Sequence, residues 1–415
     1  MAFKGYGVAR INGKVVFVPF SVIGDQAWIE IIEEKKDYSI GKLNTLIEPS
    51  PWRVHPACPS FGQCGGCQWQ HIDDSIQVEF KKWILEEILK KLGKLREIPS
   101  IHVVSSPESY GYRVRIQLKV KGEKIGYYRE KTHRIIDIDH CPISHPLMNQ
   151  ILLFIRKEFP SFSQVREIEI NVSPEEGRGV LIVHPLSFHH QLENFMHELL
   201  QTDPLLKGIA IVQKGEFILF GDPYLNFTIP LNQPGGITNL KLRSSPASFF
   251  QVNLKQNQVL FQTVLDFSEV KGDEKILDLY AGIGNLTLPL AVGAKEVLGI
   301  EENRVAVGDA RFNVESNGIK NCSFIDGKVE DILKHLEGER SDLIVLDPPR
   351  IGCKMILDQL VRLNPKKIVY VSCDPTTFSR DLHLFSESGY HLQRATLIDM
   401  FPQTYHMEVV GLLTH

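Results

Sequence analysis

Three polar motifs stand out in the C-terminal third of this 415-residue chain. Each lies directly after an apolar stretch or directly before one. They are Asp347–Arg350, Ser372–Pro375 and Asp399–Glu408. A lone cysteine in an apolar strand is usually an inert packing residue. Cys373, however, stands at the carboxyl tip of its stretch, beside polar residues, and this position favours a reactive thiol.

A thiol in this setting fits methylation at a pyrimidine carbon. C5 of uracil is a poor nucleophile, so a thiolate must first add at C6 and generate an enolate, which attacks the electrophilic methyl group of S-adenosylmethionine. A base must then remove the C5 proton so that the thiolate can leave. By chemistry alone His406 or Glu408 could be that base. The other interpretation of His406 is a hydrogen-bonding residue in a turn.

A glycine-containing turn predicts a cofactor site. The apolar stretch 275–280 runs into Gly282-Ile283-Gly284, where glycines let the backbone approach a ligand closely. Glu301, at the end of the next apolar stretch, can accept hydrogen bonds from both hydroxyls of a ribose. This pairing suits NAD and S-adenosylmethionine equally. Thr287 replaces the third glycine of the dinucleotide pattern, which disfavours a pyrophosphate ligand.

Four further cysteines have the spacing of a metal site. Cys58, Cys64 and Cys67 lie close together, and Cys141-Pro142 follows far downstream. Four thiolates suffice for tetrahedral zinc or a 4Fe–4S cluster. Zinc knuckles prefer two short Cys-x2-Cys pairs, so three close ligands with one distant Cys-Pro favour iron–sulfur. The spacing differs from that of radical chemistry, which favours a structural or RNA-contacting role.

The elements that must position these residues fall into three segments. Residues 1–52 contain short β patterns at 14–20, 26–32 and 40–47, enough for a small barrel. Residues 53–240 have a mixed α+β pattern, and a helix at about 75–92 is expected to pack on the last segment. Residues 241–415 alternate short apolar strands with helices, which predicts an α/β domain with a parallel, doubly wound, Rossmann-like sheet.

These motifs together resemble the bacterial RNA uracil-C5 methyltransferases, a family that includes enzymes acting on 23S ribosomal RNA and on the T-loop of tRNA. The resemblance also rests on residues 248–253 and 278–285 and covers nearly the whole chain. It implies a class I methyltransferase domain, with Cys373 as the nucleophile and Glu408, not His406, as the proton acceptor. The S-adenosylmethionine contacts that it implies are Gln251, Tyr280, Asn285, Glu301 and Asp347.

The resemblance also bears on the cysteines, the N-terminal segment and the RNA substrate. The ribosomal RNA enzymes carry a 4Fe–4S cluster on the cysteines matching Cys58, Cys64, Cys67 and Cys141, whereas the tRNA enzyme lacks it. Residues 1–52 resemble a TRAM domain, an OB-like RNA-binding barrel. We therefore expect 23S ribosomal RNA as the substrate. A tRNA T-loop enzyme is the alternative, and a non-catalytic iron–sulfur RNA-binding protein, which would need neither Cys373 nor Glu408, is a third interpretation.

The net charge of −4 argues weakly against a nucleic-acid partner, but the average conceals a basic segment. Residues 81–134 hold 14 Lys or Arg against 6 Glu, a local charge of +8. Within it, aromatic and cationic residues alternate at Tyr112-Arg113 and around Tyr128-Arg129, which is typical of surfaces that stack unpaired bases. A solvated strand face with buried tyrosines is the other interpretation.

The composition also bears on the cellular compartment. With 43% hydrophobic and 23% charged residues, it is that of an ordinary globular protein. No apolar run reaches membrane-spanning length, and the N-terminus has no signal-peptide pattern. We therefore expect a cytoplasmic protein with no membrane association, and no obligate protein partner is evident.

Overall fold

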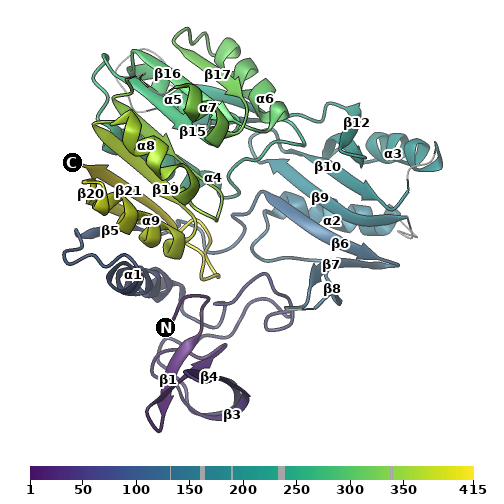
Figure 1. The fold of residues 1–415 in the computed structure, drawn as a ribbon. Helices are drawn as coiled ribbons and strands as arrows, with labels where there is room; N and C mark the ends of the chain where they lie inside the picture. The colour runs from purple at the N-terminus through teal and green to yellow at the C-terminus, as the bar shows by residue number, and fades with distance from the viewer. Residues whose placement is uncertain (131, 159–163, 188–189, 232–238, 337, 339) are drawn as a thin grey trace.

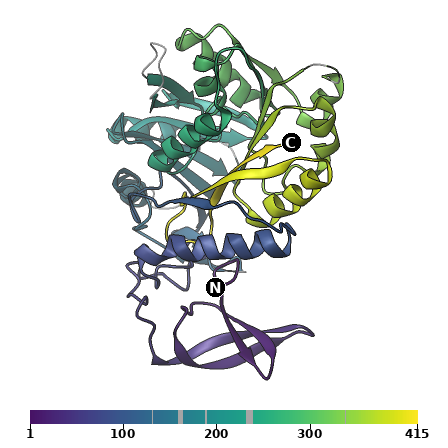
Figure 2. The same cartoon turned by 90° about the vertical axis from the view of Figure 1, so that its left-hand side faces the viewer.

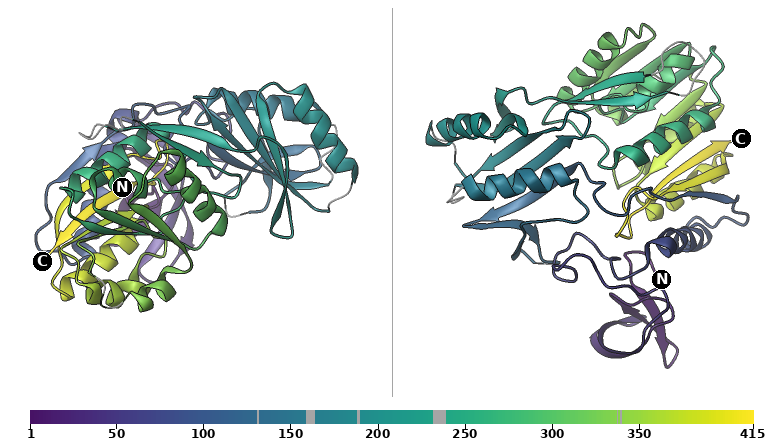
Figure 3. Two further views of the ribbon diagram at one scale, coloured as in Figure 1. Left: turned by 90° about the horizontal axis from the view of Figure 1, so that it is seen from above. Right: turned by 180° about the vertical axis from the view of Figure 1, so that it is seen from behind.

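The computed structural model describes residues 1–415 except 131, 159–163, 188–189, 232–238, 337 and 339. An N-terminal barrel, a central sheet and a C-terminal sheet follow one another along the chain (Figure 1). The barrel projects away from the other two parts, which lie beside each other (Figure 3). Among the described residues, no helix is both long and apolar enough to cross a membrane.

The N-terminal barrel is built from four strands in the order β1-β2-β4-β3. They are β1 (Gly7–Ile11), β2 (Lys14–Val18), β3 (Gln26–Glu34) and β4 (Tyr38–Glu48). The three strands expected from the sequence are β2, β3 and β4. The additional strand β1 pairs with β2 across the turn at Asn12-Gly13, where both residues have positive φ.

The central part is a seven-stranded sheet in the order β12-β11-β10-β9-β6-β7-β8. Helices α2 and α3 pack against β9–β10 and β11–β12 respectively. A separate hairpin, β13 with β14, connects this sheet to the C-terminal part. The elements are β6 (Arg115–Lys121), β7 (Lys124–Tyr128), β8 (Ile135–Asp137), α2 (Pro146–Glu158), β9 (Val165–Ser173), β10 (Arg178–Pro185), α3 (His190–Thr202), β11 (Leu206–Gln213), β12 (Glu216–Gly221), β13 (Leu225–Pro230) and β14 (Asn239–Ser244).

The C-terminal part is an eight-stranded sheet in the order β17-β16-β15-β18-β19-β21-β20-β5, with helices on both faces. The first five of these strands are parallel, as the alternating pattern predicts, and β21 is antiparallel to both of its neighbours. Its strands are β15 (Lys275–Leu279), β16 (Glu296–Glu301), β17 (Cys322–Asp326), β18 (Leu343–Leu346), β19 (Lys367–Ser372), β20 (His391–Ile398) and β21 (Glu408–Thr414), joined by β5 (Ile101–Val104). Its helices are α4 (Leu254–Ser268), α5 (Thr287–Gly293), α6 (Arg304–Ser316), α7 (Val329–His335), the 3-10 turn η1 (Lys354–Ile356), α8 (Leu357–Leu363) and α9 (Pro375–Glu387).

The segment that precedes the central sheet belongs structurally to the C-terminal sheet. Helix α1 (Asp74–Lys91) packs against α9, and β5 extends the sheet by pairing in parallel with β20. Figure 2 shows α1 lying between the barrel and the edge of this sheet. Residues 74–104 therefore lie on the C-terminal sheet, although the sequence divides the chain after residue 240.

Candidate functional site

The paired strands β19 and β21 bring the two predicted catalytic residues together. Ser372 pairs with Val409 in the antiparallel register, so the next pair along these strands is Cys373 and Glu408. Asp347 follows the neighbouring strand β18 at the same edge of the sheet. Residues from the three separate motifs thus meet at the carboxyl ends of parallel strands, where open α/β sheets bind their ligands.

Cys373, Asp347 and Glu408 form an acidic group in which burial raises all three pKa values and mutual repulsion adds to the shifts of Cys373 and Glu408. Burial raises the pKa of the Cys373 thiol to about 12, with the Glu408 and Asp347 carboxylates adding to the effect and Arg350 opposing it. Burial also raises the pKa of Asp347 to about 7. The pKa of Glu408 lies well above its usual range because the side chain is buried and Asp347 is near, although Arg350 again opposes this shift. A cation that enters the group would therefore favour ionisation of all three.

His406 lies close to these residues but has a different character. Burial, together with the positive charges of Arg350 and Lys81, lowers the pKa of its imidazole to about 4. It is therefore neutral at pH 7. Its ring centroid lies 4.2 Å from that of Tyr405 and 6.0 Å from that of Phe401.

Four of the five residues predicted to contact a cofactor line one cavity beside this group. They are Gln251, Tyr280, Asn285 and Asp347. Tyr280 has a φ of +64°, a left-handed conformation that costs free energy in a non-glycine residue and is often found at functional sites. Gly282 and Gly284 also have positive φ, as the glycine-turn interpretation requires.

Glu301 supports the same turn from the neighbouring strand. Its Oε2 accepts a hydrogen bond of 3.0 Å from the Gly282 amide, and its Oε1 accepts one of 2.8 Å from the Asn303 amide. Glu301 does not itself line the cavity. Its role toward a ribose hydroxyl stays a prediction.

Two hydrogen-bond networks hold the walls of this cavity. The side-chain amides of Asn257 and Asn285 exchange two hydrogen bonds of 2.8 Å each, which ties the glycine turn to α4. The buried Asp309 accepts hydrogen bonds from the hydroxyls of Ser245 (2.7 Å) and Ser248 (2.6 Å), which fixes the loop before Gln251.

Asp278 and Phe249 also line the cavity, although they were not among the predicted cofactor contacts. Asp278 is buried, and burial raises the pKa of its carboxyl to about 7 against the opposing effect of a 2.5 Å hydrogen bond from Thr287. The sequence feature that could have identified Asp278 is a carboxylate inside the apolar stretch that forms β15. Phe249 is 59% exposed at the cavity, unusual for a phenylalanine.

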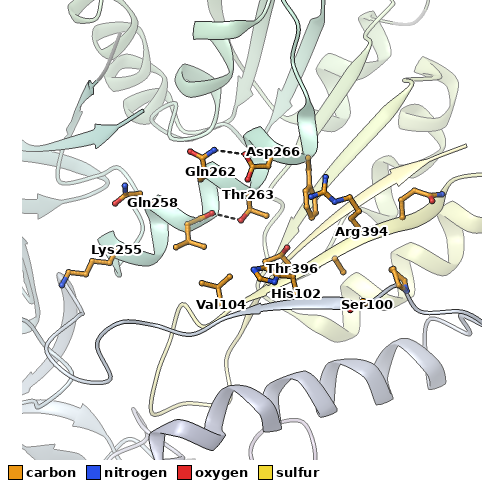
Figure 4. A pocket seen from close by; sticks show the side chains of 15 residues that line it. Ser100, His102, Val104, Lys255, Gln258, Gln262, Thr263, Asp266, Arg394 and Thr396 are labelled. Atoms are coloured by element: carbon orange, nitrogen blue, oxygen red, sulfur yellow. Dashed lines mark hydrogen bonds between the residues drawn. The ribbon is translucent and has the colours of Figure 1, made fainter. Parts of the chain in front are cut away.

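A larger cavity of about 720 Å³ lies between α4 and strands β5 and β20, but none of the predicted site residues lines it (Figure 4).

The four cysteines of the predicted metal site converge in space. Cys58, Cys64, Cys67 and Cys141 all line one cavity of about 130 Å³, although Cys141 lies far from the others in the sequence. None of them forms a disulfide. Burial raises the pKa of Cys64 to about 11 and that of Cys67 to about 12, with the neighbouring cysteines adding to both shifts. Grouped thiols of this kind are suited to a soft metal centre, whose charge would offset the cost of ionising them.

The structure changes the interpretation of the basic segment. Lys81 is buried and pairs with Asp399 at 2.6 Å, and Arg115 pairs with Glu169 at 3.0 Å. Tyr112, expected to stack on bases, is 3% exposed and donates a hydrogen bond to the Pro402 carbonyl, so this expectation is wrong. Tyr128 is 39% exposed and remains available for stacking.

Comparison with known proteins agrees with this geometry. Residues 73–415 match the family model tRNA (Uracil-5-)-methyltransferase, and residues 2–52 match the TRAM domain of tRNA (uracil(54)-C(5))-methyltransferase. An uncharacterized RNA methyltransferase of Aquifex aeolicus is 34% identical over 100% of this chain and 96% of its own length. The 23S rRNA (uracil(1939)-C(5))-methyltransferase RlmD of Pectobacterium atrosepticum is 33% identical over 99% of this chain and 91% of its own.

A solved structure extends the likeness to the whole fold. The Pyrococcus abyssi tRNA (uracil-54, C5)-methyltransferase, in complex with S-adenosyl-L-homocysteine, has a TM-score of 0.77 and 27% identity, with 99% of each chain covered. The predicted TRAM domain and α/β methyltransferase fold are confirmed. The TRAM match is to a tRNA enzyme, so the barrel does not separate the two RNA substrates. The chain belongs to the RNA (uracil-5-)-methyltransferase family.

Proposed function

We propose that this protein transfers a methyl group from S-adenosylmethionine to C5 of a uridine in 23S ribosomal RNA. The observation that carries the proposal is the register of β19 and β21, which sets Cys373 opposite Glu408 beside the Asp347 carboxylate. The 33% identity to a named 23S rRNA enzyme over nearly the whole chain supports the choice of RNA. Membership of an enzyme family argues against the non-catalytic alternative.

S-adenosylmethionine, when bound, supplies an electrophilic methyl group and a positive sulfonium. Gln251, Tyr280, Asn285 and Asp347 line the cavity that would hold it, and the acidic surroundings suit a cation. The Pyrococcus abyssi relative was solved in complex with S-adenosyl-L-homocysteine, which supports S-adenosylmethionine as the methyl donor.

The residues of this chain would act in sequence on the uridine. The target base must leave its stack so that its C6 can reach Cys373. The Cys373 thiol must first lose its proton, and the thiolate then bonds to C6, which makes C5 nucleophilic. C5 takes the methyl group, with S-adenosylhomocysteine as the leaving group, and Glu408 accepts the C5 proton. Departure of the sulfur then restores the C5–C6 double bond. This order requires Glu408 to be ionised once C5 is methylated. The sulfonium has then become a neutral thioether, so the cation that still favours ionisation of Glu408 is Arg350, whose charge opposes the raised pKa.

Mapping of 5-methyluridine in a deletion strain tests the substrate. We expect one or more sites to be lost from 23S ribosomal RNA, with the uridine corresponding to position 1939 examined first because the named relative acts there. Loss of 5-methyluridine from the tRNA T-loop, with ribosomal RNA unchanged, would instead establish the second candidate. The whole-chain likeness to the Pyrococcus abyssi tRNA enzyme is the observation that favours this alternative.

The four-cysteine cavity is proposed to hold a 4Fe–4S cluster. The donor set fits, because four thiols and no carboxylate or imidazole line the cavity. The remaining lining is largely apolar and includes Phe61, Tyr127 and Ile143, which would shield a cluster from water.

Metal analysis checks this assignment. Protein purified without oxygen should be brown and should contain iron and sulfide at about four each per chain. Replacement of Cys141 by Ser should lower both together. Stoichiometric zinc in the wild-type protein, without sulfide, would contradict the cluster.

A further inference from the structure

The loop that leads to Glu408 is held by residues from four other segments of the chain. It comprises residues 399–407 and joins β20 to β21. Five successive backbone carbonyls, those of residues 399–403, each accept a hydrogen bond from outside the loop. The donors are Gln256 Nε2 to Asp399 (3.0 Å), Asn253 Nδ2 to Met400 (3.3 Å), Lys81 Nζ to Phe401 (3.0 Å), Tyr112 Oη to Pro402 (3.0 Å) and the Trp69 amide to Gln403 (3.0 Å).

Gln403 is the most tightly held residue of this loop. It is fully buried and has a φ of +67°, so its backbone is strained and persists only because its surroundings impose it. Gln77 of α1 supplies much of that restraint: its Oε1 accepts from the Gln403 amide at 2.9 Å, and its Nε2 donates to the Gln403 side-chain oxygen at 3.2 Å. Gln403 also donates to Asp74 at 2.5 Å.

The same contacts join the loop to the cysteine segment. The amides of Gln68 and Trp69, which directly follow Cys67, both donate to the Gln403 carbonyl, at 3.1 and 3.0 Å. The same Gln77 Nε2 also lies within hydrogen-bonding distance of the carbonyls of Trp69 (3.3 Å) and Ile72 (2.9 Å), so these acceptors share its two protons with the Gln403 oxygen. The buried Gln77 side chain therefore touches the loop and the cysteine segment at once.

We propose that Gln77 is a positioning residue for Glu408: by fixing Gln403, it holds the loop that enters β21 at Glu408, where the pairing of β21 with β19 sets the carboxylate opposite Cys373. This inference rests on the proposed function, because it assumes that Glu408 accepts the C5 proton. A small displacement of a general base can cost on the order of 100-fold in rate. The step that would be slowed is removal of the C5 proton, which follows methylation.

The Gln77→Leu variant tests this inference. Leucine keeps the volume but loses both hydrogen bonds to Gln403. We expect a denaturant-resistant protein–RNA adduct to accumulate during turnover, with kcat lowered at least about tenfold and the KM for S-adenosylmethionine unchanged. A loss of stability alone would lower the active fraction and would not make methylated adduct accumulate. Gln77→Glu retains the acceptor for the Gln403 amide and should show a smaller accumulation.

The matched control is Gln359→Leu, which removes a half-buried glutamine that donates to the Glu330 carbonyl, away from the loop. It should turn over without adduct. If circular dichroism shows that the Gln77→Leu variant is unfolded, the Gln77→Glu variant tests the inference instead. An amount of adduct above the wild-type level supports the inference, and a wild-type amount overturns it. If Glu408→Gln gives adduct but the folded Gln77 variants do not, the inference fails while the proposed function stands. If Glu408→Gln gives none, the assigned base fails, and the inference fails with it.

Discussion

Replacement of Cys373 by Ala should abolish methyl transfer to RNA while S-adenosylmethionine still binds. Without the sulfur, C6 of the uracil has no nucleophile to add to it, and C5 stays too weakly nucleophilic to take a methyl group. The binding cavity is lined by other residues, so its ligand contacts remain. Removal of a covalent catalyst should lower the rate by at least about 10⁴-fold. Transfer of a radiolabelled methyl group to RNA measures the activity, and calorimetric titration with S-adenosylhomocysteine measures the binding.

A second cysteine provides the matched control. Cys322 begins β17, is half-buried and has no place in the proposed reaction. Cys322→Ala should retain methyl transfer within a few fold. If Cys373→Ala keeps substantial activity in the same assay, the covalent route through C6 is wrong.

The C-terminal fold could be predicted because its signals are local. Strands such as β18 and β19 are buried along nearly their whole length, so they appear in the sequence as continuous apolar runs between helical patterns. In such a sheet the carboxyl ends of the parallel strands lie at one edge. The motifs after β15, β18 and β19 could therefore be assigned to one site from the sequence alone.

The pairing of distant segments could not be predicted in this way. Strand β5 has only four residues, and its partner β20 comes almost 300 residues later. Nothing in the local pattern distinguishes an edge strand of the C-terminal sheet from one of the central sheet. The same holds for Gln77 and Gln403, 326 residues apart, because a glutamine gives no sequence signal for the amide it will meet.

The net charge of a sequence segment is misleading about the basic surface for the same reason, because ionic partners can come from distant parts of the chain. The +8 of residues 81–134 suggests one basic surface, but three of its cations lie next to carboxylates from distant segments. Lys81 pairs with Asp399, Arg115 with Glu169 and Lys119 with Glu167. A count along the sequence does not include partners contributed by other strands. The cations that remain available to phosphate are therefore fewer than the sequence suggests.

Replacement of Glu408 by Gln should trap the enzyme on its RNA. Glutamine has the shape of a protonated glutamate, the form that burial favours here, so the fold and the approach of Cys373 to the base should be preserved. The amide cannot accept the C5 proton, so the reaction should stop after methylation with the Cys373 sulfur still bonded to C6. General-base removal typically costs about 10²- to 10⁴-fold, which makes the adduct long-lived.

A denaturing gel with labelled RNA should show this adduct as a slowly migrating band that contains both the transferred methyl group and the protein. Glu387→Gln, a change in an exposed glutamate at the end of α9, should show no such band and should turn over normally. The double variant Cys373→Ala with Glu408→Gln should lose the band as well, because no sulfur remains to form the bond. Turnover of Glu408→Gln at the wild-type rate would show that another group removes the proton. The neutral imidazole of His406 would then be the first candidate, although its lowered pKa makes it a weak base.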